Sequence, residues 1–259
     1  MKLDEWLRWY EWIVEYLNLD RDKDREAATL LSRLICNKRI VSVENLKWEL
    51  RKFRYVIIFG AGPSLKQDIS LAKPILSRDG ACVVACDGAA KALLEQGVRP
   101  FLVVTDLDGD ADTLLSCSSR GVIMAVHAHG DNMDKLSLIV PKLNGPLIGS
   151  SQVEPTACLV NFGGFTDGDR AVLLCEHLGC KCIILGGMDF GNEVGEYSKP
   201  FRVEGGLLSR KLKKLEIGRR ILEWLAQTSG AELIDATSGS EGIRGFKRLS
   251  WSELEKRLS

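Results

Sequence analysis

Several features that would point to a particular class of protein are missing from this chain of 259 residues. Neither sign of charge is in excess, since 35 Lys and Arg balance 35 Asp and Glu. No apolar run approaches the roughly 20 residues that a helix needs to cross a bilayer. The first residues, MKLDEWLRWYEW, mix acids and bases with aromatics, so they do not indicate a signal peptide. We therefore expect a cytoplasmic protein that binds neither nucleic acid nor membrane.

The common signatures of metal and nucleotide sites are missing as well. None of the eight cysteines forms a C-x-x-C pair and no H-x-x-x-H spacing occurs, so zinc is not indicated. The sequence has no G-x-x-x-x-G-K-[ST], which argues against a P-loop kinase. Cys82, Cys86, Cys158 and Cys182 lie in or beside apolar runs, which predicts small buried side chains. A disulfide between other cysteines remains an alternative if the protein comes from a hyperthermophile, because intracellular proteins of such organisms often contain disulfides.

The first 54 residues differ from the remainder of the chain. They contain no glycine, and apolar residues recur at helical spacing over residues 6–17. Residues 21–35 indicate a second helix. A chain of this length suits a large domain with a small appendage. We therefore expect a small helical N-terminal region over residues 1–54 and an α/β catalytic domain over residues 55–259.

Short apolar runs recur after residue 54, and each ends in glycine or polar residues. They are YVIIF, CVVAC, FLVVT, VIMAV, CLVNF, CIILG and the shorter ELI. Continuous β-prone runs of about five residues are typical of strands buried on both faces. Segments of helical pattern separate them, so the sequence predicts an α/β fold with an open, mostly parallel sheet and helices on both faces. The polar clusters fall at the carboxyl ends of the strands, where such sheets bind ligands.

The most acidic strand end is DLDGD, at residues 106–110. Like charges this close resist ionising together, so a cation is expected beside them. An EF-hand does not fit, because Ala111 and Cys117 stand where that loop needs Gly and Glu. A haloacid-dehalogenase-type phosphatase with Asp106 as nucleophile stays open. Against it, Asp110 replaces the usual Thr, and two apolar runs precede the motif.

A wider window extends the acidic pattern to the preceding strand. ACDGAAKALLEQGVRPFLVVTDLDGD places Asp87-Gly88 at one strand end and Asp106-x-Asp108 at the next. It resembles the catalytic core of thiamin pyrophosphokinases, departing at Lys91, where that family commonly has Asn. A longer series is similar to the archaeal-type 6-hydroxymethyl-7,8-dihydropterin pyrophosphokinases, which share that core. It spans about 190 residues and comprises FGAGPSL, ACDGAA, VTDLDGD, VHAHGDN, GFTDGDRA, GGMDFG, KLKKL and DATSGSEGIRGFKR.

This resemblance implies a Mg²⁺-dependent enzyme of pterin cofactor (tetrahydromethanopterin or folate) biosynthesis. It would transfer the β,γ-diphosphate of ATP to the pterin hydroxymethyl group and release AMP. Asp87, Asp106 and Asp108 are expected to hold Mg²⁺, which prefers a few carboxylates plus phosphate oxygens and water. Thiamin stays open as the acceptor, since it is also a flat heterocycle with a primary alcohol. A non-catalytic nucleotide-binding module is a further alternative, and a homo-oligomer is left open.

Two more clusters at strand ends are expected to bind the nucleotide. GAGPS indicates a tight strand-to-helix turn, in which free N–H groups at Gly60, Gly62 and Ser64 would suit an anion. HAHGDN ends the fourth run, and His129 is a candidate to help deprotonate the acceptor hydroxyl or to contact nucleotide or a second metal. Asp131 and Asn132 of HAHGDN are also expected to bind the nucleotide, as is Gly88, which follows the second run.

GFTDGDRA opens the helix that follows the fifth run. Thr166 or Asp167 can cap that helix, but capping does not explain Asp169 and Arg170 as well. Arg170 could clamp a phosphate. In GGMDFG, Asp189 is a candidate for the guanidine-like edge of the pterin, where a carboxylate accepts two hydrogen bonds, and its role could be exchanged with that of Asp167.

A long basic helix is predicted over residues 207–227. Its leucines mark one apolar side, and its lysines and arginines cover the other faces. Lys211 and Lys213 are candidates to bind phosphate, while a solvated helix surface is the alternative. Ser250 with Glu253 fits a capping box and predicts a short last helix.

Overall fold

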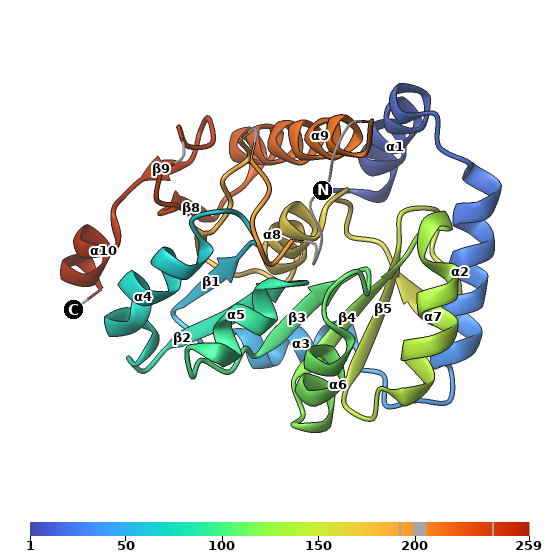
Figure 1. Cartoon of the computed structure of the whole chain (residues 1–259), viewed down its shortest axis with the longest axis horizontal. Coiled ribbons are helices and arrows are strands. Elements are labelled where there is room, and N and C mark those ends of the chain that lie inside the picture. The colour runs from blue at the N-terminus through green and yellow to red at the C-terminus, as the bar shows by residue number, and fades with distance from the viewer. Residues whose placement is uncertain (192, 199–205, 240, 259) are drawn as a thin grey trace.

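The apolar runs of the sequence form the centre of one parallel sheet (Figure 1). The structure is a computed structural model that describes residues 1–191, 193–198, 206–239 and 241–258. Over those residues the sheet order is β6-β5-β4-β3-β2-β1-β7-β8-β9, and every neighbouring pair is parallel. The strands are β1 (Tyr55–Phe59), β2 (Ala81–Cys86), β3 (Leu102–Thr105), β4 (Ile123–Ala128), β5 (Leu147–Ser151), β6 (Leu159–Val160), β7 (Cys182–Gly186), β8 (Glu232–Asp235) and β9 (Lys247–Arg248).

The predicted open α/β sheet is confirmed, and its central strands are buried except at Ala81 and Cys182, the partly exposed first residues of β2 and β7. Ile57 of β1, for example, pairs with Val83 on one side and Ile184 on the other. Strands β5 and β9 were not predicted, because LIGSS has only two strongly apolar residues and β9 is a pair of exposed basic residues. The run CLVNF contributes only the two residues of β6. Pairing with a neighbouring strand, and not local sequence, makes these segments strands.

Helices occupy both faces of the sheet (Figure 1). Helices α4 to α7 connect consecutive strands from β1 to β5, whereas α8 returns the chain from β6 to β7. The strand order therefore reverses between β1 and β7, which is where sheets of this kind open a ligand crevice. The helices are α1 (Leu3–Leu17), α2 (Arg21–Ile35), α3 (Val43–Leu50), α4 (Leu65–Leu76), α5 (Ala89–Glu95), α6 (Ala111–Ser119), α7 (Met133–Ile139), α8 (Asp167–His177), α9 (Gly206–Thr228) and α10 (Trp251–Arg257), with 3₁₀ turns η1 (Gly130–Asn132) and η2 (Val140–Lys142).

Three helices, α1 to α3, form the N-terminal region. Their apolar stripes join the same hydrophobic core as the sheet, and Trp6 donates from Nε1 to the carbonyl of Gln152 at 2.8 Å. A disulfide between Cys36, at the end of α2, and Cys158, just before β6, also links this region to the sheet. The prediction that Cys158 is a small buried apolar side chain is therefore wrong, because its sulfur is bonded to Cys36. The division of the chain at residue 54 stays a prediction.

The described helices include none that combines the length and the apolar character needed to span a bilayer. The capping box predicted at Ser250 is confirmed: its Oγ accepts from the N–H of Glu253 at 3.3 Å, and α10 starts there.

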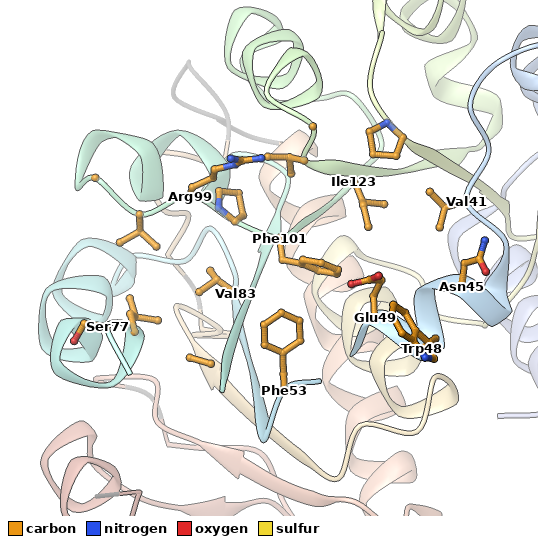
Figure 2. Close-up of a pocket in the computed structure, with 18 of the residues that line it drawn as sticks. Val41, Asn45, Trp48, Glu49, Phe53, Ser77, Val83, Arg99, Phe101 and Ile123 are labelled. Atoms are coloured by element: carbon orange, nitrogen blue, oxygen red, sulfur yellow. The ribbon is translucent and has the colours of Figure 1, made fainter. Parts of the chain in front are cut away.

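A broad apolar groove of about 1130 Å³ lies at the amino edge of the sheet (Figure 2). Its floor includes Val83 and Ile123 from the starts of β2 and β4, and the rings of Phe53 and Phe101 meet edge to face with centroids 5.4 Å apart. Trp48 on its rim is 62% exposed. The groove lies at the edge opposite the polar strand ends, so the predicted site residues belong to a different cavity.

Candidate active site

A cavity of about 500 Å³ lies at the carboxyl edge of the sheet, beside the reversal between β1 and β7. Its walls come from the strand ends, the start of α8 and one face of α9. Among the predicted site residues it brings together Gly60, Gly62, Asp87, Asp106, Asp108, His129, Asp131, Thr166, Asp167, Asp189 and Lys211. Directly behind these lie Ser64, Gly88, Asn132, Asp169 and Arg170.

Three carboxylates converge in this cavity. One oxygen from each of Asp87, Asp106 and Asp167 lies within 4.8 Å of the other two. Asp87 and Asp106 follow the neighbouring strands β2 and β3, and Asp167 is the first residue of α8. Asp87 adopts a left-handed backbone (φ 45°), and its Oδ1 accepts from Thr105 Oγ1 at 2.5 Å and from the N–H of Gly109 at 3.1 Å. These bonds fix the orientation of the Asp87 carboxylate.

The three carboxyl groups of the cluster differ in the direction of their pKa shifts. Burial, with the neighbouring charge of Asp106, raises the pKa of Asp87 to about 7. Burial and the charges of Asp106 and Asp87 also raise the pKa of Asp167 well above its usual range. Burial opposes ionisation of Asp106 too, but the contact with His129 and the charge of Arg170 outweigh it and lower the pKa of Asp106. The cluster thus brings three carboxyl groups together beside one arginine, and a bound cation would allow all three to ionise.

The other two aspartates of DLDGD point elsewhere. Leu107 adopts a left-handed backbone (φ 66°) and is buried, so the chain turns sharply between Asp106 and Asp108. Asp108 lines the cavity as an ion pair with Lys135, outside the three-carboxylate cluster. Asp110 caps α6 by accepting from the N–H of Thr113 at 2.8 Å. The sequence therefore placed Asp108 where the structure brings Asp167.

The turn that carries His129 is fixed by its own hydrogen bonds. His129 Nδ1 accepts from the N–H of Asp131 at 3.3 Å, so Nε2 carries the proton and faces Asp106 Oδ2 at 3.4 Å. Asn132 is buried and donates from Nδ2 to the carbonyls of Asp106 and His127, both at 2.8 Å. Asp131 forms an ion pair with Arg210 of α9 at 3.3 Å. Asn132 therefore braces two strand ends and faces away from the cavity.

The first residues of α8 have two roles: some cap the helix, and others belong to the charged cluster. Asp169 accepts from the N–H groups of Phe165 at 2.6 Å and Thr166 at 2.7 Å, so it caps α8 and braces the loop before it. The pKa of Asp169 is raised by burial, although these hydrogen bonds oppose the rise. Arg170, only 6% exposed, lies 3.4 Å from Asp167. Capping thus explains Thr166 and Asp169, while Asp167 and Arg170 belong to the charged cluster.

The GAGPS turn differs from its prediction. The N–H groups of Gly60 and Gly62 donate to the carbonyls of Gly186 and Gly187, both at 2.9 Å. The N–H of Ser64 donates to Asp189 Oδ2 at 3.2 Å. The prediction of free N–H groups at these three positions is therefore wrong, because the turn uses them to bind the segment after β7. A side chain at Gly62 would clash with Asp189, so the glycine permits this approach.

Helix α9 presents a basic face to the cavity. Arg210, Lys211 and Lys214 line it, and Lys211 donates from Nζ to Ser198 Oγ at 2.6 Å. Lys213 instead lies over the ring of Tyr16 in α1, with Nζ 5.5 Å from the centroid. The expectation that Lys213 faces the cavity is wrong, since a step of two residues turns a helix by about 200° from Lys211.

Arg210, Lys214 and Asp24 were missed by the sequence analysis. Arg210 and Lys214 are spaced i and i+4, a signal that marks one face of a helix. Asp24 of α2 is 4% exposed and accepts from the N–H of Gly130 at 2.7 Å, beside His129. It lies on the same stripe as Ala27, Ala28, Leu31 and Ile35, and a charge on a buried stripe is the signal that could have found it.

Comparison with known proteins gives strong matches. The sequence model of the family described as "6-hydroxymethylpterin diphosphokinase MptE-like" matches residues 29–195. Three curated relatives are each named 6-hydroxymethyl-7,8-dihydropterin pyrophosphokinase. They come from Methanocaldococcus jannaschii (41% identical over 87% of this chain and 96% of that protein), Pyrococcus furiosus (44%, over 91% and 99%) and Methanothermobacter thermautotrophicus (38%, over 90% and 99%).

Two solved structures resemble the fold at low sequence identity. The Maf glycosyltransferase from Magnetospirillum magneticum AMB-1 has a TM-score of 0.54 and 16% identity, over 81% of this chain and 38% of that one. This similarity concerns the fold alone. A thiamin pyrophosphokinase from Geobacillus thermodenitrificans has a TM-score of 0.32 and 20% identity, over 68% and 57% of the two chains, which is too low to carry an argument.

Proposed function

Because this chain belongs to the MptE-like family of 6-hydroxymethylpterin diphosphokinases, we propose that it transfers diphosphate from ATP to 6-hydroxymethyl-7,8-dihydropterin. The pterin hydroxyl oxygen would attack the β-phosphorus and lose its proton to solvent, the bond from that phosphorus to the oxygen it shares with the α-phosphate would break, and AMP would leave with that oxygen. The observation that carries this proposal is the convergence of Asp87, Asp106 and Asp167 opposite the basic face of α9. Carboxylates facing cations across one cavity suit a metal-bound polyphosphate.

The three carboxylates fit a hard divalent cation. Their oxygens lie close enough together to share one ion, and burial together with the neighbouring negative charges raises the pKa values of Asp87 and Asp167. We propose that Asp87, Asp106 and Asp167 bind Mg²⁺. Asp108, which the sequence predicted as a ligand, lines the same cavity beside this cluster. When bound with ATP, Mg²⁺ would neutralise the phosphate charge that grows as AMP leaves.

Basic residues on α9 and one beside the carboxylate cluster would hold the phosphates. Lys211 and Lys214 face the cavity from α9, and burial lowers the pKa of Lys214. Arg170 lies beside Asp167, and a planar guanidinium suits bidentate contact with phosphate. We assign Lys211, Lys214 and Arg170 to orienting the transferred diphosphate. Arg210 lies on the same face of α9 as Lys214 and forms an ion pair with Asp131.

Asp189 is our candidate for the pterin edge, since Asp167 belongs to the cluster. Both hydrogen bonds from Ser64 go to Oδ2 of Asp189, so Oδ1 can accept from a ligand N–H. We assign His129 to orienting Asp106, because one ring nitrogen already accepts from the backbone and the other faces that carboxylate. Its alternative role in taking the hydroxyl proton would need that contact to break.

Product analysis tests the reaction. The protein is incubated with ATP, Mg²⁺ and 6-hydroxymethyl-7,8-dihydropterin, and the nucleotides are resolved by anion exchange. We expect AMP, equal in amount to the pterin diphosphate, only when the pterin is present. ADP would indicate an ordinary kinase, and free phosphate without an acceptor would indicate a phosphatase acting through Asp106. Thiamin in a parallel reaction tests the acceptor, and a preference for thiamin would overturn the substrate while leaving the reaction standing.

A further inference from the structure

The turn that carries His129 is held from outside the sheet by helix α2. Asp24 accepts from the N–H of Gly130 at Oδ1 (2.7 Å), and its Oδ2 accepts from Tyr10 Oη at 2.5 Å and from Gln152 Nε2 at 2.7 Å. The carboxylate is 4% exposed, so these hydrogen bonds replace water around a buried acid. One oxygen therefore serves the turn, and the other ties Asp24 to α1 and to the segment after β5.

Helix α2 also approaches the turn too closely for a side chain to intervene. A Cβ at Gly130 would lie 2.7 Å from Cβ of Lys23, a distance that Cβ atoms essentially never show. A hollow of about 210 Å³ between residues 18–24 and the turn is lined by Asp106 and His129 as well. The N-terminal region is therefore in direct contact with the catalytic cavity through this turn.

The contacts form one continuous chain from α2 to the carboxylate cluster. Asp24 holds the N–H of Gly130, the adjacent His129 faces Asp106 from Nε2 at 3.4 Å, and Asp106 belongs to the cluster. A buried acceptor that is itself held by two further hydrogen bonds fixes an N–H group more firmly than water does, because water exchanges freely. Loss of Asp24 would remove the hold of α2 and leave the backbone that aims the imidazole to the turn's own hydrogen bonds.

We propose that Asp24 is a positioning residue for the reaction, acting through the turn of residues 129–132 on His129 and Asp106. The proposal rests on the function proposed above. According to this proposal, α2 supports catalysis by holding the turn, in addition to packing against the sheet. Asp24 itself does not touch the substrates in this scheme.

A double-mutant cycle tests the coupling. We expect Asp24→Ala to lower kcat about thirtyfold with KM for ATP changed less than about threefold, because the turn moves while the α9 face stays. In a His129→Ala background the same substitution should lower kcat less than about twofold, because the imidazole through which Asp24 acts on Asp106 is already absent. Equal losses in both backgrounds would overturn the proposal.

Two further variants separate positioning from stability. In Asp24→Asn the amide oxygen can still accept from Gly130, and its NH₂ can be met by a flipped Gln152, so kcat should stay within about threefold of the wild type. Tyr10→Phe removes one of the two donors to Oδ2 and leaves the bond from Gly130 to Oδ1 in place, so it should lower Tm while leaving kcat nearly unchanged. An Asp24→Asn variant as slow as Asp24→Ala, or a Tyr10→Phe variant equally slow, would contradict positioning.

Hydrogen exchange gives a readout that does not depend on the reaction. Amides 129–132 should exchange faster in Asp24→Ala than in Tyr10→Phe, in the absence of any ligand. Unchanged exchange would refute the positioning role, whatever the enzyme does. A wild-type protein that makes no AMP from ATP and the pterin would instead refute the proposed function, so the two failures are distinct.

Discussion

The three aspartates of DLDGD are chemically identical and have three different environments. Asp106 joins the cluster, Asp108 pairs with Lys135, and Asp110 caps α6. The left-handed residue Leu107 separates the first two by turning the backbone between them. A single residue's backbone thus decides which carboxylate faces the cluster and which faces a lysine.

Substitution of the carboxylates should follow this division. Asp106→Asn and Asp167→Asn should each lower kcat roughly a hundredfold or more, because each removes a charge from the proposed Mg²⁺ site. Asp108→Asn should cost about tenfold or less, since its charge is partly balanced by Lys135. Steady-state AMP formation at saturating ATP measures both. A loss in Asp108→Asn as large as the other two would restore the metal ligand predicted from sequence.

Asp87 should make the metal-free protein less stable as the pH rises. Its pKa is about 7 in the folded protein and lower when unfolded, so between roughly pH 4 and 7 the folded state binds more protons. Stability is therefore lost as pH rises through that window. In EDTA, Asp87→Asn should raise Tm by a few degrees at pH 7.5, because the amide oxygen can keep the bonds from Thr105 and Gly109.

Thermal unfolding at several pH values measures this effect. The Tm difference between Asp87→Asn and the wild type should shrink towards pH 4, where the wild-type carboxyl is protonated in both states. With Mg²⁺ present the wild type should gain stability and the variant should gain less. A difference that does not vary with pH would exclude Asp87 as its source.

At the scale of elements, the rotation of α9 decides which lysines face the cavity. Lys211 and Lys214 line it, whereas Lys213, between them in sequence, lies over Tyr16 of α1. Figure 1 shows α9, in orange, beside α1, in dark blue, consistent with this contact and with Arg220 lying 5.7 Å from the ring of Trp12. The basic helix thus packs against the N-terminal region with one face and against the cavity with another.

Alanine substitution along α9 tests this assignment. Lys211→Ala and Lys214→Ala should each raise KM for ATP or lower kcat by about tenfold, through loss of a phosphate contact. Lys213→Ala is the matched control, because it removes the same charge from the same helix, and it should change turnover less than about twofold. Equal effects at all three positions would favour a general influence of helix charge.

At the scale of the whole molecule, one disulfide closes a long loop. Cys36 and Cys158 are separated by 122 positions, so the bond restricts the unfolded chain strongly. In the chain-entropy description this amounts to roughly 5 kcal/mol. Dithiothreitol should therefore lower Tm by several degrees. The double variant Cys36→Ser with Cys158→Ser should start at that lower Tm and not respond to the reductant, and a response in it would point to another disulfide.

Much of the fold could be predicted from sequence, because it depends on local pattern. Apart from CLVNF, the apolar runs form strands over most of their length with helices between them, and Asp87 and Asp106 follow neighbouring strands, as predicted. The failures have physical causes. Strand β5 exists because β4 and β6 pair with it, and the N–H groups of Gly60 and Gly62 are used by a segment far along the chain.

The sequence by itself determined most of the sheet, the edge at which ligands are expected to bind and the acidic strand ends, since periodicity and charge are local properties. Only the tertiary structure decided which charges meet. Asp167 joins Asp106 because α8 returns the chain to the centre of the sheet, and Asp24 reaches the turn of His129 because α2 packs against it. Such contacts join segments distant in sequence, and they depend on how whole elements pack, which no local pattern encodes.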